Sequence, residues 1–301
     1  MLAPGQGSQT PGMLASWLEL SGAADRVATW SQISGLDLAR LGTTATAEEI
    51  TDTAVTQPLV VAATLLAHEE LTRRGQLDGK AVVAGHSVGE IAAYAIAGVI
   101  SADDAVKLAA TRGAEMAKAC SIEPTGMSAV LGGDEAEVLA RLEALDLVAA
   151  NRNAAGQIVA AGALAALDKL AEDPPAKARV RQLATAGAFH THYMASASDG
   201  YAAAAEAVTT AESLRPNVTL LSNADGQAVA SAADAMAKLV NQMTKPVRWD
   251  LCTATMRQQN VSAIVEFPPA GTLAGIAKRE LRGVPTHAVK SPADLDGLAE
   301  L

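Results

Sequence analysis

A six-residue segment, GHSVGE at residues 85–90, stands between two apolar runs and constrains the fold more than any other part of the chain. The run at 82–84 has the length of a buried strand, and the run at 91–97 has the composition of a buried helix ended by a glycine. A strand, a sharp turn and a helix form a nucleophile elbow, in which the serine of a G-x-S-x-G segment lies at the tip of the turn. The sequence therefore predicts that Ser87 is an exposed nucleophile, with the backbone N–H of Val88 directed to the same space.

The composition argues against several classes of protein. The 301 residues are half hydrophobic, enough for one large domain or a domain with an insertion, and the net charge of −10 argues against nucleic acid as the main partner. No apolar run approaches membrane-spanning length and no basic-then-apolar leader precedes the domain, so we expect a cytoplasmic protein with no membrane partner. Cys120 and Cys252 lack the spacing of metal ligands, and we interpret both as small buried hydrophobic residues.

Strands and helices alternate along most of the chain, which predicts an α/β fold with a parallel sheet. Between residues 125 and 187 the order becomes strand, helix, strand, strand, helix, strand, as in a ferredoxin-like unit. We expect these elements at residues 127–131, 135–145, 147–151, 157–161, 163–171 and 178–183. Residues 1–124 and 188–301 are therefore expected to form an α/β-hydrolase-like catalytic domain, and residues 125–187 a small inserted α+β subdomain.

Two helices before the insertion carry candidate polar residues. One is expected to begin at Gln57 and Pro58, because proline is favoured in the first turn of a helix. The other begins at Ser101 and places Arg112 on a stripe of small apolar residues. On the sequence alone, an arginine there is expected to reach solvent or to pair with Glu115.

A serine nucleophile needs a base that takes its proton. Among the five histidines, His190 and His192 directly follow the insertion, and the sequence alone does not choose between them. His86 adjoins Ser87, but we expect its side chain to point elsewhere in the turn. In α/β-hydrolases an aspartate or glutamate stands between the serine and the histidine, and no acidic residue here lies in a context that fits this role.

Five motifs occur in an order that resembles a known family. They are PGQGSQ at 4–9, TQP at 56–58, GHSVGE at 85–90, RG at 112–113 and AFH at 188–190. The chain resembles the malonyl-CoA:acyl carrier protein transacylase family of type II fatty-acid synthesis, in its actinobacterial form, over essentially its whole length. The acyltransferase domains of polyketide synthases share these motifs. Only two residues of the first strand precede PGQGSQ, so we expect the N-terminus to be trimmed relative to the family.

The resemblance implies a role for particular residues. It makes Ser87 the nucleophile and His190 the base, which the side-chain carbonyl of Gln242 would orient. It implies an oxyanion hole from the backbone N–H groups of Gln6 and Val88. The residues expected to bind substrate are Arg112 on the malonyl carboxylate, Phe189 as selector against larger acyl groups, Gln57, Met116 and Asn153. A lone phenylalanine is by default part of the core, and this reading of Phe189 stays open.

The implied reaction moves a malonyl group from malonyl-CoA to the phosphopantetheine thiol of acyl carrier protein. It needs no metal and no cofactor, and we expect a monomer. Alternatives are a polyketide acyltransferase, a serine thioesterase or esterase, and a non-catalytic acyl-CoA sensor. A dinucleotide-binding enzyme is poorly supported, because GQG at 5–7 lacks the third glycine of that fingerprint. Two basic clusters are candidates for carrier docking, namely Lys177, Arg179 and Arg181, and Lys278, Arg279 and Arg282.

Overall fold

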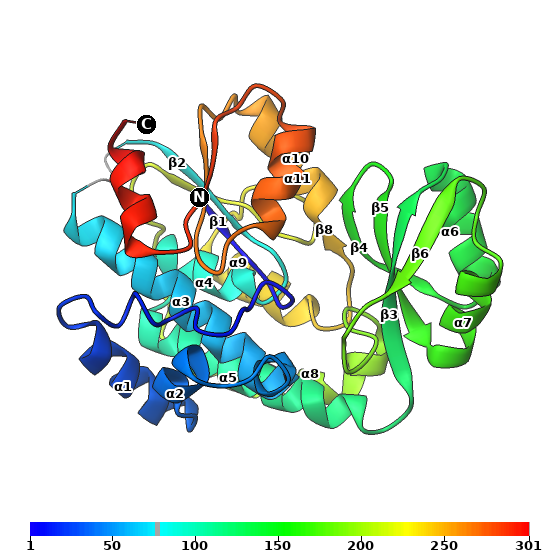
Figure 1. The fold of residues 1–301 in the computed structure, drawn as a ribbon, viewed down its shortest axis with the longest axis horizontal. Coiled ribbons are helices and arrows are strands. Elements are labelled where there is room, and N and C mark those ends of the chain that lie inside the picture. The colour runs from blue at the N-terminus through cyan, green and yellow to red at the C-terminus, as the bar shows by residue number, and fades with distance from the viewer. Residues whose placement is uncertain (76–78, 301) are drawn as a thin grey trace.

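The computed structural model of the chain describes residues 1–75 and 79–300, and within this part it contains two five-stranded sheets (Figure 1). The first sheet is parallel with the order β10-β9-β1-β2-β7. Its strands are β1 (Leu2–Ala3), β2 (Ala81–Gly85), β7 (Val218–Leu220), β9 (Ile264–Glu266) and β10 (Thr286–Ala288). The predicted α/β fold with a parallel sheet is confirmed.

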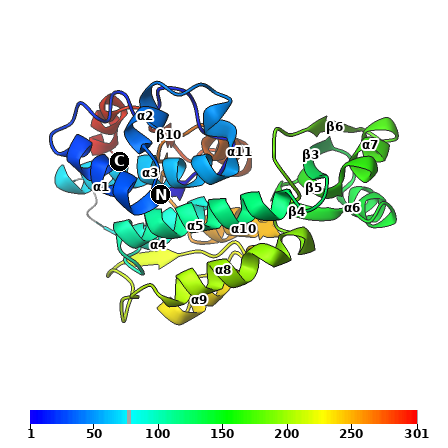
Figure 2. The same cartoon turned by 90° about the horizontal axis from the view of Figure 1, so that it is seen from below.

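Helices cover both faces of the parallel sheet (Figures 1 and 2). The first face carries α1 (Ala23–Ser34), α3 (Thr53–Arg73), α4 (Gly89–Ile96), α5 (Ala102–Cys120), α8 (Ala195–Glu206) and α9 (Ala232–Asn241). The other face carries α10 (Trp249–Gln258) and α11 (Thr272–Glu280). Val83 of β2 packs into the first core and Ala84 into the second, so this strand has no polar face.

The 125–187 segment forms most of the second sheet, seen in green in Figure 1. Its strands are β3 (Thr125–Gly132), β4 (Val148–Ala154), β5 (Gln157–Ala163) and β6 (Ala178–Gln182), antiparallel in the order β6-β3-β5-β4. Helices α6 (Glu135–Ala144) and α7 (Leu164–Glu172) pack on it around a separate core. All six elements were predicted from the sequence.

Strand β8 (Val247–Arg248) adds to this second sheet in parallel with β4. It comes from the part of the chain that follows the insertion, so backbone hydrogen bonds between β8 and β4 join that part of the chain to the 125–187 segment. The division of the chain at residues 125 and 187 stays a prediction.

The start of α3 differs from the prediction. The helix begins at Thr53, where the side chain of Asp52 accepts a hydrogen bond from the N–H of Ala54. Pro58 lies inside the helix, so the predicted start at Gln57 and Pro58 is wrong. The capping aspartate starts the helix one turn earlier, and the proline removes only one early intrahelical bond.

Several helices were not predicted from the sequence. These are α1, α2 (Leu38–Thr43), α8, α10 and the short helices η1 (Glu49–Thr51), η2 (His192–Met194) and η3 (Pro292–Glu300). None of the helices in the described part of the chain is long and apolar enough to cross a membrane.

Candidate active site

Ser87 lies on a tight turn between β2 and α4. Its φ of +53° is a left-handed conformation that few residues other than glycine adopt. A Cβ on Gly85 would overlap the backbone of Gly89, and a Cβ on Gly89 would overlap the carbonyl of Ala3. Both glycines are therefore needed for the close approach that presents Ser87 at the tip of the turn.

His190 lies 2.7 Å from Ser87, measured between Nε2 and Oγ. Its Nδ1 lies 2.8 Å from the backbone carbonyl oxygen of Gln242. Because a carbonyl only accepts, Nδ1 carries the proton, and Nε2 is free to accept from the serine hydroxyl. Burial, together with the charge of Arg112, lowers the pKa of His190 to about 3, so the imidazole is neutral at pH 7. This is the arrangement of a nucleophile and its general base.

The group that accepts a hydrogen bond from Nδ1 of His190 differs from the sequence prediction. We expected the side-chain carbonyl of Gln242, and that detail is wrong because the backbone carbonyl takes this position. The side chain instead makes its two shortest hydrogen bonds to Arg112 and Glu90, besides longer ones of 3.3 Å to the carbonyl oxygen of Ser87 and Oδ1 of Asn223. Its Oε1 accepts from Nη2 of Arg112 at 2.8 Å, and its Nε2 donates to Oε2 of Glu90 at 2.5 Å.

The other histidines are not within hydrogen-bonding distance of Ser87. His192 is exposed and stacks against Tyr193. His86 lines the same cavity as Ser87, and its Nε2 lies 2.8 Å from Oδ1 of Asn153. The expectation that His86 points away from the site is therefore wrong, because β4 brings a polar partner over the elbow.

Arg112 is 1% exposed, and neither solvent nor Glu115 holds it. Nη1 donates to Oε1 of Gln57 at 2.9 Å, and Nη2 lies 3.4 Å from Ser87 Oγ. Glu115 pairs with Lys118 instead. The close approach of α5 to α3 makes this possible, because a Cβ on Gly113 would meet the carbonyl of Thr53. Nε of Arg112 has no acceptor among the described residues, so the guanidinium keeps donor capacity for a ligand.

The backbone N–H groups of Gln6 and Val88 have no acceptor in the described part of the chain. Gly5 packs so closely against the backbone of His86 that a Cβ there would overlap its carbonyl oxygen. The side chain of Gln6 donates to Thr53 Oγ1 at 3.2 Å, which leaves its backbone beside the elbow. Two free N–H groups near a nucleophile are the requirement for an oxyanion hole.

One cavity of about 430 Å³ joins most of the predicted site residues. Its lining includes Gln6, Gln57, Ser87, Arg112, Met116, Asn153, Phe189 and His190. Val88 and Gln242 do not line it. Val88 is buried in the core behind the turn, and Gln242 reaches the site through its bonds to His190 and Arg112. Phe189 is 6% exposed, so it is both a core residue and part of the cavity wall.

Sequence reasoning missed two buried polar residues next to the site. Asn223 follows β7, where its Oδ1 accepts from the N–H of Ser87 at 2.8 Å and its Nδ2 donates to the carbonyl of Gly85 at 2.7 Å. Glu90, fully buried in α4, accepts from the N–H of Asn223 at 2.6 Å. Burial raises the pKa of Glu90 to about 7, against the lowering effect of its hydrogen bonds. An acid within an otherwise apolar helix was the available signal for Glu90.

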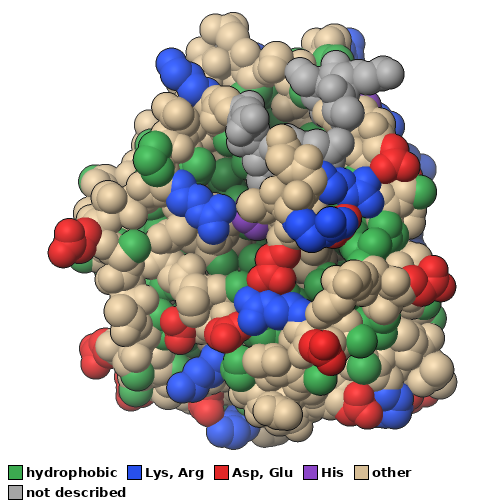
Figure 3. All heavy atoms as spheres, turned by 90° about the vertical axis from the view of Figure 1, so that its left-hand side faces the viewer, with side chains coloured by type: hydrophobic (Ala, Val, Ile, Leu, Met, Phe, Trp, Pro, Cys, Tyr) green, Lys and Arg blue, Asp and Glu red, His purple; other side chains and the backbone are tan. Residues whose placement is uncertain are grey.

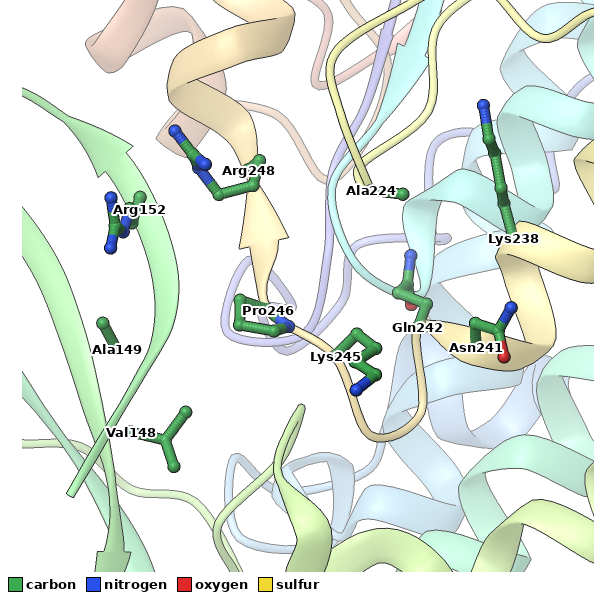
Figure 4. A pocket seen from close by; sticks show the side chains of 10 residues that line it. All are labelled: Val148, Ala149, Arg152, Ala224, Lys238, Asn241, Gln242, Lys245, Pro246 and Arg248. Atoms are coloured by element: carbon green, nitrogen blue, oxygen red, sulfur yellow. The ribbon is translucent and has the colours of Figure 1, made fainter. Parts of the chain in front are cut away.

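A second cavity, of about 690 Å³, borders Gln242 between β4 and the segment that joins α9 to β8 (Figure 4). Four basic residues line it, namely Arg152, Lys238, Lys245 and Arg248. Three of them already pair with carboxylates, namely Arg152 with Glu135, Lys238 with Asp225 and Arg248 with Asp250. Their positive charge is therefore largely balanced within the chain.

The described residues contain no group of three or more His, Cys, Asp or Glu side chains that could hold a metal ion. Cys252 is buried, as predicted, and Cys120 is only half-buried.

Comparison with known proteins gives concordant results. The chain matches the family model of the acyl transferase domain over residues 2–293. It is 83% identical over 293 residues to a malonyl CoA-acyl carrier protein transacylase of Mycolicibacterium smegmatis, covering 96% of this chain and 100% of the relative. It is similar to the crystal structure of MCAT from Mycobacterium tuberculosis, with a TM-score of 0.96, 76% identity, and coverage of 99% of this chain and 98% of that one.

A third similarity concerns a complex. A malonyl-transacylase that was solved together with its type II polyketide synthase acyl-carrier protein is 29% identical to this chain, with a TM-score of 0.92. The match covers 100% of this chain and 98% of that one.

Proposed function

The chain belongs to the acyl transferase domain family and, within it, to the malonyl CoA-acyl carrier protein transacylases, and we propose that it moves a malonyl group from malonyl-CoA to the phosphopantetheine thiol of an acyl carrier protein. The transfer would pass through a malonyl ester of Ser87. One observation carries the proposal. The Ser87–His190 pair and the buried guanidinium of Arg112 line one cavity, with Nη2 of Arg112 3.4 Å from Ser87 Oγ. The cavity thus combines an acyl-transfer pair with a site for a carboxylate.

In the first half-reaction, Oγ of Ser87 attacks the thioester carbonyl of malonyl-CoA while its proton passes to Nε2 of His190. The N–H groups of Gln6 and Val88 donate to the oxyanion, and each such donor contributes about 3 kcal/mol in comparable sites. The bond between carbon and sulfur then breaks, His190 returns the proton to the CoA sulfur, and the malonyl group remains on Ser87.

In the second half-reaction, the phosphopantetheine thiol gives its proton to His190 and attacks the ester carbonyl. The bond between the carbonyl carbon and Oγ breaks, and His190 returns the proton to Ser87. One thioester replaces another, so the chemistry itself requires neither a metal nor a redox cofactor. We propose that the chain works in this way as a monomer in the cytoplasm.

The acyl carrier is proposed to be that of fatty-acid synthesis. The similarity to a malonyl-transacylase that binds a type II polyketide carrier protein supports an acyl carrier protein as the second substrate. To test the function, the chain would be incubated with malonyl-CoA and its mass measured by mass spectrometry. It would then be mixed with purified fatty-acid and polyketide carriers, and the mass of each carrier would be measured in the same way. Malonyl on Ser87 and then on the fatty-acid carrier is expected. Transfer only to the polyketide carrier would favour that pathway, and steady malonate release without carrier would indicate a thioesterase.

Arg112→Ala is expected to lower kcat/KM for malonyl-CoA by at least about 10-fold, because a charge-assisted pair in a buried site contributes more than 1.4 kcal/mol, one factor of ten. With acetyl-CoA the loss should be much smaller. An acetyl group leaves the buried guanidinium unpaired in the wild-type chain, and the variant removes that penalty.

The ratio of kcat/KM for malonyl-CoA to that for acetyl-CoA measures this effect. Lys118→Ala provides the control, because Lys118 lies on the exposed side of the same helix and pairs with Glu115. Equal losses with both acyl groups, together with a lower melting temperature, would show that Arg112 is only structural.

Carrier docking is expected to depend on local positive charge, since both the chain and a typical carrier are acidic. The cluster Lys278, Arg279 and Arg282 stands near the cavity, because Nη2 of Arg279 donates to Oε1 of Gln157, a cavity-lining residue. On the face opposite the 125–187 segment, basic and acidic side chains are interspersed (Figure 3). We therefore expect docking on the α11 side, with Lys177, Arg179 and Arg181 as the second candidate cluster.

Charge reversal of the α11 cluster should raise KM for the carrier by about 5-fold or more with little change in kcat, and added salt should raise the wild-type KM. Lys80→Glu is the control, since Lys80 is exposed at the N-terminal end of β2, away from the elbow. A carrier KM that responds neither to salt nor to reversal of either cluster would contradict the prediction.

A further inference from the structure

Glu90 is 0% exposed and does not line the catalytic cavity. Both of its oxygens accept hydrogen bonds, from the N–H of Asn223 at 2.6 Å and from Nε2 of Gln242 at 2.5 Å. No lysine or arginine in the described part of the chain forms an ion pair with it within 4.0 Å. The side-chain amide of Gln242 lies between Glu90 and the guanidinium of Arg112. This buried carboxylate is therefore not part of a direct ion pair.

The carboxylate determines how the Gln242 amide is turned. In its ionised form Glu90 only accepts, so Gln242 then directs its NH₂ group to Glu90, which leaves its Oε1 to accept from Nη2 of Arg112 at 2.8 Å. On the other side of the guanidinium, Oε1 of Gln57 accepts from Nη1 at 2.9 Å. Two amide oxygens thus fix the plane of the guanidinium, and Glu90 sets the orientation of one of them.

Glu90 also acts on the nucleophile turn. The same carboxylate holds the backbone of Asn223, whose side chain accepts from the N–H of Ser87 and donates to the carbonyl of Gly85. One buried group therefore anchors both the turn that carries the nucleophile and the side chain that would hold the acyl carboxylate. Removing such a shared anchor affects geometry more than any single surface contact does.

We infer that Glu90 is a positioning residue that, through the amide of Gln242, aligns Arg112 for an acyl group bearing a carboxylate and thereby contributes to acyl-group selection. The inference rests on the proposed function, in which Arg112 binds the malonyl carboxylate. It assigns Glu90 no contact with substrate and no proton transfer.

Glu90→Gln tests this inference. The variant keeps the size of the side chain and one accepting oxygen, which can still accept from the N–H of Asn223 and so hold the nucleophile turn. The other oxygen becomes an NH₂ donor that faces Gln242, so Gln242 must turn its own NH₂ toward Arg112 or lose a hydrogen bond. We expect kcat/KM for malonyl-CoA to fall by about 10-fold, mainly through KM, and kcat/KM for acetyl-CoA to change by less than about 3-fold. Glu70→Gln is the matched control. Glu70 is 7% exposed, pairs with Arg73 and Arg74 at the far end of α3, and should affect stability but not the malonyl-to-acetyl ratio.

A second variant covers the case in which Glu90→Gln does not fold. Gln242→Met keeps the backbone carbonyl that accepts from His190 and removes the side-chain hydrogen bonds that link Gln242 to Arg112 and to Glu90. It should lower the malonyl-to-acetyl ratio as Glu90→Gln does, and the double variant should show no further loss, because both changes break the same chain of contacts.

Three outcomes would overturn the inference. They are an unchanged ratio in Gln242→Met, equal losses for both acyl groups in Glu90→Gln, and additive effects in the double variant. Failure of the proposed function is distinguished by the wild-type chain, which would then form no malonyl ester at all.

Discussion

Ser87→Ala is expected to abolish malonyl loading and transfer while leaving the chain folded. The change removes only Oγ, the atom that lies 2.7 Å from Nε2 of His190 and that would carry the malonyl ester. Without a nucleophile no ester can form, so the transfer rate should fall by roughly 10⁴-fold or more. The oxyanion donors and Arg112 would remain, but they stabilise a reaction that no longer has an attacking group.

The fold should tolerate this change for a local reason. Alanine keeps the Cβ, so the steric cost of the φ of +53° is the same as for serine, and the backbone N–H at position 87 still donates to Asn223. The measurement is the mass of the chain after incubation with malonyl-CoA, together with carrier loading and the melting temperature. Ser128→Ala, in a buried serine of β3 outside the cavity lining, is the control. Residual transfer above about 1% of the wild-type rate, from a folded variant, would mean that another group is the nucleophile.

The parts of the fold that were predicted correctly depend on local patterns. The elbow needs only a strand, two glycines and a helix in succession, and all three are contiguous between residues 81 and 96. The six elements of the 125–187 segment were predicted because turn residues separate short apolar runs at regular intervals. The start of α3 was predicted incorrectly because Asp52 and Pro58 both favour a helix start, and the sequence does not show which one takes effect.

The contacts within the site depend on tertiary packing and were largely outside the reach of sequence reasoning. Arg112 stays buried because α3 brings Gln57 to it and the α9–β8 segment brings Gln242, and neither approach is visible in helical periodicity. Periodicity also gave no way to tell whether the side chain or the backbone of Gln242 meets His190. Asn223 stands 136 residues from Ser87, and only the parallel pairing of β2 with β7 brings it beside the elbow.

His190→Ala is expected to reduce kcat/KM for malonyl loading by about 10²–10⁴-fold, the usual effect of losing a general base, whereas His192→Ala should change it by less than about 3-fold. Of these two histidines, only His190 lies within hydrogen-bonding distance of the Ser87 hydroxyl, with its second nitrogen bonded to a backbone carbonyl that fixes the tautomer. His192 is exposed against Tyr193 and makes an internal control two residues away. Equal losses in the two variants would contradict the assignment of His190 as the base.

The pH dependence of rate and stability provides a second test of His190. Burial and the charge of Arg112 hold the pKa of His190 near 3, so protonation of this imidazole should not lower the wild-type kcat/KM for acetyl-CoA as the pH falls through 6.5, where an ordinary histidine becomes protonated. The low pKa of His190 lowers the stability of the folded chain in acid instead. Below pH 6.5 the unfolded chain binds a proton that the folded chain excludes at this position, so the free energy of unfolding falls as the pH drops from 6.5 toward 3. His190→Ala should therefore weaken the acid dependence of the melting temperature. With acetyl-CoA, whose rate does not depend on the alignment of Arg112 by Glu90, a wild-type rate that follows a pKa of 6.5 would mean that the base is a histidine exposed to solvent, not the buried one beside Ser87.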